Sequence, residues 1–136
     1  MELPHDSLLL RIFIGESDRH DGKPLYEAIV LKARELHLGG ATVLRGAMGF
    51  GKSSRIHTSK ILRLSVDLPL IIEIVDSEEK IQAFLPVLES MMVGGLVTLE
   101  KARVIYYGTA ASSPPFGVKP PAPSRKSTGW KTNSIA

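Results

Sequence analysis

The sequence predicts an α+β fold in which a four-stranded antiparallel sheet carries two helices on one of its faces. Three observations lead to this prediction. The chain has 136 residues, which suits a single domain. Short apolar segments have the length and composition of strands, and two longer segments repeat apolar residues at helical spacing. From residue 108 the composition shifts to Pro, Ser, Gly and Thr, so we expect a folded domain over 7–107 and a disordered tail over 108–136.

The first half of the chain is expected to form a strand, a helix and a second strand. Residues 8–14 are apolar and partly β-branched, and they end at Gly15, which is typical of a strand. After a polar loop, Pro24 suits the first position of a helix, and the pair Gly39–Gly40 is expected to end that helix. The second strand is predicted over 41–48.

The second half is expected to repeat this order. The clearest strand covers 68–75, and Ser77 then offers a side-chain oxygen as the N-cap of a helix. Pro86 lies inside this helix and should bend it, and Gly94–Gly95 closes it. The last strand is predicted over 96–107.

The segment between the two halves fits neither a clear helix nor a clear strand. Residues 50–66 have weak amphipathic spacing but equally suit an excursion that returns to the sheet. Two βαβ halves joined in this way are typical of the ferredoxin-like βαββαβ arrangement. That arrangement covers only one face of the sheet. The prediction therefore includes an open face.

Two charged residues are expected on this open face. Arg11 and Glu73 lie in otherwise apolar strands that are neighbours in the ferredoxin-like topology. A pair of charges in such a setting is best accommodated if a second subunit covers and orders it, so we expect an oligomer that uses this face. The alternative is a solvated ion pair on an exposed sheet.

The basic isoelectric point belongs to the tail and not to the domain. Residues 108–136 hold four basic residues and no acidic residue, whereas the preceding residues hold 13 basic and 14 acidic ones. A nearly neutral domain has no broad field for phosphate groups, so nucleic acid is not expected as a partner.

The sequence also argues against secretion and against a membrane span. It has no cysteine, its first residues are polar and acidic, and its apolar runs are short. We expect a cytoplasmic protein that does not insert into the membrane.

The stretch from Gly46 to Ser53 matches the phosphate-binding P-loop pattern G-x-x-x-x-G-K-[ST]. A small nucleotide hydrolase using Lys52 and the later carboxylate of Asp76 is therefore one alternative function. A P-loop, however, joins a parallel strand to a helix N-terminus. This alternative is excluded if the second and third strands are antiparallel neighbours.

A second interpretation of the same stretch is the base of a loop that binds an anion. Glycines allow positive φ angles and close backbone approach, and backbone N–H groups in such turns can form an anion nest. We therefore predict a ligand site that requires no cofactor and takes a nucleotide or another anionic effector. Its predicted residues are Gly46, Gly49, Gly51, Lys52, Ser53, Arg55 and His57.

No catalytic or metal-binding set is predicted. Residues 16–21 place three carboxylates and a histidine in one loop, but such loops are usually solvated turns, and no second cluster with ligand spacing appears. Nothing else in the chain assembles a catalytic motif. The sequence therefore favours a protein that is not an enzyme. A structural oligomer that binds no ligand is a further alternative to a ligand-binding regulator.

Long segments of the domain resemble a known family. They are LLLRIFIGESDRHDGKPLYEAIVLKARELHLGGATVLRGAMGFG, SRIHTSKILRLSVDLPLIIEIVDSEEKI and GLVTLEKARVIYY. They are similar to small PII-like proteins of a family long labelled as a domain of unknown function, related in fold to the nitrogen-regulatory PII (GlnB-like) signal transducers. The resemblance covers about residues 7–107 and leaves the tail outside.

This resemblance implies a ferredoxin-like subunit that assembles into a trimer, with the sheets lining its centre. It also implies that the segment 46–66 is a partner-binding loop, and that adenine nucleotides bind in clefts between subunits. A membrane transporter is one partner that the family's gene associations imply. In PII proteins the turn before the last strand carries basic residues that hold a triphosphate, whereas the corresponding residues 91–96 of this sequence include no base.

Overall fold

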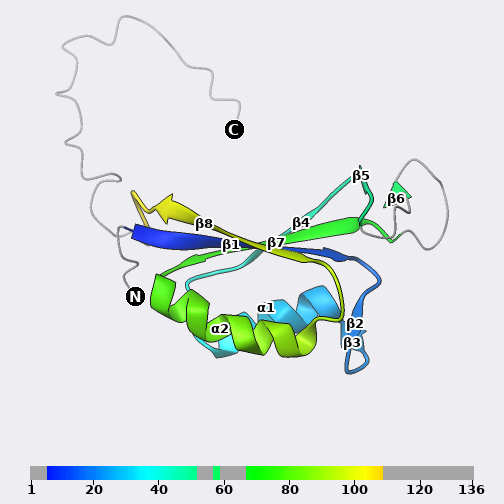
Figure 1. Cartoon of the computed structure of the whole chain (residues 1–136), viewed down its shortest axis with the longest axis horizontal. Coiled ribbons are helices and arrows are strands. Elements are labelled where there is room, and N and C mark those ends of the chain that lie inside the picture. Colours follow the sequence, from blue (N-terminus) through cyan, green and yellow to red (C-terminus); the bar gives the residue numbers. More distant parts are fainter. Residues whose placement is uncertain (1–5, 52–56, 59–66, 109–136) are drawn as a thin grey trace, which may run out of the picture.

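The computed structural model describes residues 6–51, 57–58 and 67–108 (Figure 1). Its main sheet has four antiparallel strands in the order β4-β7-β1-β8, and both helices lie on one face of that sheet (Figure 1). The predicted ferredoxin-like fold is therefore confirmed. The elements are β1 (Asp6–Gly15), α1 (Leu25–Glu35), β4 (Thr42–Arg45), β7 (Pro69–Asp76), α2 (Glu78–Met91) and β8 (Leu96–Arg103).

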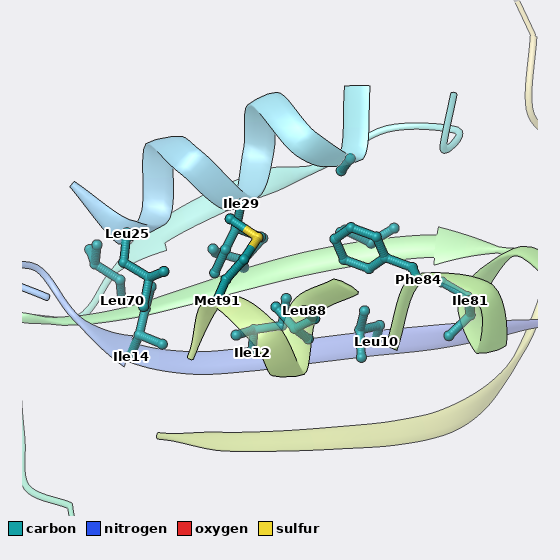
Figure 2. Packing of buried hydrophobic residues seen from close by; sticks show 13 residues of the cluster. Leu10, Ile12, Ile14, Leu25, Ile29, Leu70, Ile81, Phe84, Leu88 and Met91 are labelled. Carbon is teal, nitrogen blue, oxygen red and sulfur yellow. The ribbon is translucent and has the colours of Figure 1, made fainter. Parts of the chain in front are cut away.

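The core lies between the sheet and the two helices (Figure 2). From Leu10 onward in β1, and throughout β7, every second residue is buried, as the two-residue period of a strand requires. Each helix has apolar residues spaced three or four apart, which form one stripe that packs against the sheet. The buried side chains are Leu10, Ile12, Ile14, Leu25, Ile29, Ala33, Leu70, Ile72, Ile74, Ile81, Phe84, Leu88 and Met91.

The ends of α1 differ from the prediction. Pro24 is the N-cap and not the first helical residue. The helix ends at Glu35, before the glycine pair, and His37 adopts a left-handed conformation with φ of 61°. The amide of Leu38 donates to the carbonyl of Ala33, which completes a Schellman motif. A histidine therefore ends this helix, where Gly39–Gly40 had been expected to do so.

The start of α2 follows the prediction. The side chain of Ser77 accepts a hydrogen bond from the amide of Lys80, at 3.2 Å, as an N-cap does. The helix continues through Pro86 as far as Met91. In the part of the chain that is described, no helix is both long and apolar enough to cross a bilayer.

The outer strands are shorter than predicted. The second strand of the sheet covers Thr42–Arg45, and the last one stops at Arg103. Two short ribbons complete the described structure: β2 (Arg19–His20) with β3 (Lys23–Pro24), and β5 (Met48–Gly49) with β6 (His57–Thr58). Figure 1 shows both ribbons at the same end of the main sheet.

Candidate ligand-binding site at the base of the loop

The predicted loop leaves the sheet between β4 and β7. Its two limbs are joined where they leave, because the amide of Gly46 donates to the carbonyl of Pro69 at 2.7 Å. Further out, β5 pairs with β6 in an antiparallel ribbon, with Gly49 opposite His57. Residues 57–58 are thus in a strand, and the remainder of the segment for which two alternatives were predicted lies almost entirely outside the described residues.

The loop that follows β1 also forms hydrogen bonds with the base of the predicted loop. The amide of Glu16 donates to the carbonyl of Leu68, and the amide of Ser17 donates to the carboxylate of Asp67, both at 2.8 Å. The guanidinium of Arg45 donates to the carboxylate of Glu16. Three separate segments of the chain are therefore fastened together at the base of the loop.

The glycines at this base are explained by the close approach of a neighbouring side chain and not by a positive φ angle. A Cβ added to Gly46 would lie 2.8 Å from the ring of Pro69, and one added to Gly49 would lie 3.1 Å from it. Neither glycine is among the described residues with positive φ, and nor is Gly51, whose added Cβ would have no described atom within 4 Å. Pro69 thus lies close to Gly46 and Gly49, and none of the three glycines uses the positive φ that glycine permits.

The P-loop alternative is wrong. Strands β4 and β7 are antiparallel neighbours, with Thr42 opposite Glu73, whereas a P-loop needs a parallel sheet. Asp76 is also unsuited to a magnesium ligand, because it is 1% exposed and accepts hydrogen bonds from the amides of Gly39 and Ser77, each at 2.7 Å. Its observed role is to join the α1–β4 connection to the start of α2.

The structure places only part of the predicted anion site. Gly46, Gly49 and Gly51 lie at the loop base, and His57 lies in β6. Lys52, Ser53 and Arg55 lie outside the described residues. The predicted ligand site therefore stays a prediction.

A second glycine-rich turn lies at the same end of the sheet. Gly95 has φ of 103°, and a Cβ added to it would lie 2.5 Å from the carbonyl oxygen of Phe13. The strand register places Leu96 opposite Phe13, at the end of β1 that also holds the loop base. The resemblance predicts part of a nucleotide site near this turn, and this stays a prediction.

The open face of the sheet carries the predicted pair of charges, together with a third. The Nε of Arg11 donates to Glu73 at 2.8 Å, and one of its terminal nitrogens donates to Glu100 at 3.1 Å. The hydrogen bond with Glu73 is the main cause that raises the pKa of the Arg11 guanidinium above its ordinary value. The pairing is confirmed, and its role in an oligomer stays a prediction.

Sequence reasoning missed Glu100 and the contact between Arg45 and Glu16. Glu100 could have been found from alternation, because it shares the open face with Thr98, the residue opposite Arg11. No sequence pattern predicts the contact of Glu16 with Arg45, because it joins a loop to the end of an edge strand 29 residues later.

The carboxylates of the loop after β1 have structural partners. Asp18 accepts from the amide of Gly15 at 2.9 Å, and Asp21 lies 3.4 Å from a nitrogen of His20. Within the described residues, no group of three or more His, Asp or Glu side chains has the geometry to hold a metal ion.

Comparison with known proteins identifies a matching family and similar proteins. Residues 7–104 match the model of the family described as "Uncharacterized ACR, COG1993" (DUF190). A UPF0166 protein of Aquifex aeolicus is 44% identical over 98 residues, which cover 72% of this chain and 92% of that protein. A UPF0166 protein of Methanocaldococcus jannaschii is 37% identical over 97 residues, which cover 71% of this chain and 89% of its own.

A solved structure shares the fold. CPII from Thiomonas intermedia K12, described as a nitrogen regulatory PII-like protein bound to ADP, AMP and bicarbonate, superposes with a TM-score of 0.51. The match covers 73% of this chain and 88% of that chain, at 17% sequence identity. The likeness shows that the fold described above is PII-like.

Proposed function

Because the chain belongs to the DUF190 family and has the PII-like fold, we propose that it is a non-catalytic regulator that binds an anionic effector, of the adenine-nucleotide class, at the base of its 46–66 loop. The observation that carries this proposal is the set of hydrogen bonds that joins the two limbs of the loop to each other and to the loop after β1. A loop whose two limbs are held to the sheet and to the loop after β1 presents a fixed frame to a ligand. The ligand-bound state of CPII supports the choice of ligand class.

The proposed mechanism is a shift in the conformational equilibrium of the loop. A ligand changes that equilibrium only by binding one conformation more tightly than another. The loop in its ligand-bound conformation then contacts a protein partner, for which a membrane transporter is the candidate. A cytoplasmic location is part of the same proposal.

We further propose that the active form is a homotrimer. The open face supports this, because it combines half-buried apolar residues with the cluster of Arg11, Glu73 and Glu100. Strands β4 and β8 are the two edges of the sheet. Edges on opposite sides suit head-to-tail contacts between copies, and such contacts close into a ring when the rotation allows it.

Isothermal titration with ATP, ADP, AMP and cyclic dinucleotides tests the ligand, and bicarbonate is added in a parallel series. We expect binding to the wild type, with weaker binding to Lys52→Ala and to Arg55→Ala because each loses a cation beside the ligand. Lys23→Ala is the matched control, since it removes an exposed cation from β3. Heat signals from none of these ligands would refute the proposal.

Turnover assays with ATP and GTP test the non-catalytic part. Steady release of phosphate that survives purification of the chain to homogeneity would contradict it.

Native mass spectrometry tests the trimer. We expect Ile71→Arg to produce monomers, because it replaces an apolar residue of the open face with a long charged side chain that the proposed interface would have to bury. Leu31→Arg is the matched control, since it replaces an exposed leucine of α1. A wild type that is monomeric at every concentration would exclude this assembly.

A further inference from the structure

An apolar groove runs between α1 and the segment that leads into β4. It has a volume of about 360 Å³ and is lined mainly by Val30, Ala33, Leu38 and Ala41, with Arg34 and His37 also lining it. The groove and the candidate ligand site lie at opposite ends of β4, because β4 begins beside the groove and ends at the loop base. The proposed regulatory function does not use it.

The wall of this groove is fixed by hydrogen bonds to three other elements. The carbonyl of His37 accepts from the ammonium of Lys80 at 3.0 Å, and the amide of Gly39 donates to Asp76 at 2.7 Å. The hydroxyl of Tyr107 donates to the carbonyl of Gly39. The groove is therefore preformed, which lowers the entropic cost of filling it.

The contact of Tyr107 also shows where the described chain ends. Gly39 lies between Leu38 and Gly40, which both line the groove, so Tyr107 brings the chain to the groove's rim. The residues that follow lie outside the part matched by the family model, which stops at residue 104. The tail therefore lies outside the domain that the family model describes.

The first part of the tail has the chemistry that the groove accepts. Residues 109–118 read TAASSPPFGV and carry no charge, so they meet no repulsion from Arg34. Phe116 is nine residues beyond Tyr107, a separation that an extended chain spans over about 30 Å. The prolines before Phe116 restrict the free chain, which reduces the entropy lost on docking.

We propose that the groove between α1 and β4 is the docking site of the chain's own 109–118 segment, with Phe116 as the apolar anchor. An aromatic side chain gains from leaving water, and the short connection gives it a high effective concentration at the groove. The docked tail covers the outer side of the α1–β4 connection.

The single tryptophan of the chain makes a direct test. Trp130 lies in the tail, so the double variant Trp130→Phe, Phe116→Trp moves the only indole to the anchor position of the full-length protein. We expect its emission to shift to the blue relative to the wild type. Quenching by acrylamide should fall at least about twofold, the change expected when more than half of the molecules are docked.

A groove variant shows whether this indole is in the proposed place. Gly40→Glu adds a charge to the groove lining, at a glycine that has ordinary φ and no described atom within 4 Å of an added Cβ. It should return the emission and the quenching to those of an exposed indole. An exposed indole at position 116, or a protected one that ignores Gly40→Glu, would overturn the proposal. Protection that grows with protein concentration would assign the groove to another copy and would overturn it as well.

Hydrogen–deuterium exchange tests the same contact without altering the groove. In Phe116→Ser the peptide spanning residues 36–44 should exchange several-fold faster than in the wild type. Trp130→Ser is the control, because it removes the other large aromatic group of the tail. Equal exchange in Phe116→Ser and the wild type, or equal acceleration in both variants, contradicts docking through Phe116.

Discussion

Two glycine-rich turns meet the same end of the sheet, and they need glycine for different physical reasons. In the turn between α2 and β8, Gly95 has a positive φ and faces the backbone of β1. At the loop base, Gly46 and Gly49 have ordinary φ angles and face the ring of Pro69. The first turn is constrained by conformation and by backbone, the second by one side chain. Substitutions at the two turns should therefore differ in cost and in whether a second mutation can rescue them.

The largest effect is expected at Gly95. Gly95→Ala combines a φ of 103° that L-residues rarely adopt with a Cβ 2.5 Å from the carbonyl oxygen of Phe13. A left-handed conformation alone costs about 1–2 kcal/mol, and the backbone of β1 would also have to move, so we expect a loss of about 3 kcal/mol or more in the free energy of unfolding. Urea denaturation followed by circular dichroism measures it.

Its neighbour provides the matched control. Gly94 has no positive φ, and no atom of the described residues lies within 4 Å of a Cβ added to it. Gly94→Ala should therefore change the free energy of unfolding by no more than about 0.5 kcal/mol. Equal losses for the two variants would mean that the turn as a whole, and not the conformation of Gly95, limits stability.

An intermediate effect is expected at Gly46, and it should be reversible. The Cβ of Gly46→Ala would lie 2.8 Å from Cγ of Pro69, and relief of such overpacking typically costs about 1–3 kcal/mol. Pro69→Ala removes the ring while leaving the carbonyl that accepts from the amide of Gly46. The double variant should recover most of the loss in a double-mutant cycle. Additive losses in that cycle would show that the ring is not the obstacle.

The sequence predicted the fold well because the strongest patterns belong to the core. Alternating apolar residues in β1 and β7, and the stripe through Ile81, Phe84 and Leu88, are each sufficient to identify their element. The family resemblance and the PII-like fold are both confirmed. The ends of the elements were less predictable. A left-handed histidine is uncommon, so Gly39–Gly40 was the more reasonable choice for the end of α1.

The candidate site was less predictable, for two physical reasons. Whether a position requires glycine depends on which atoms a Cβ would meet there. At Gly46 these atoms belong to Pro69, which is 23 residues away in sequence. Contacts such as that between Arg45 and Glu16 join loops whose relative position follows from the whole topology. The ion pair of Arg11 with Glu73 could be predicted from the sequence, because strand pairing alone brings these residues together.

The smallest effect on stability, and the most informative about ligand binding, is expected at Gly51. Among the described residues, no atom lies within 4 Å of a Cβ added to this glycine, which also has no positive φ, so the described part of the unliganded fold gives no reason for it. If a bound anion approaches its backbone closely, Gly51→Ala should weaken ADP binding by up to about tenfold, or ~1.4 kcal/mol, while thermal stability stays unchanged. Gly40→Ala is the control, because its Cβ is equally free and lies at the other end of β4. Calorimetry at matched ionic strength compares the two, and an affinity of Gly51→Ala equal to that of the wild type would move the ligand away from this turn.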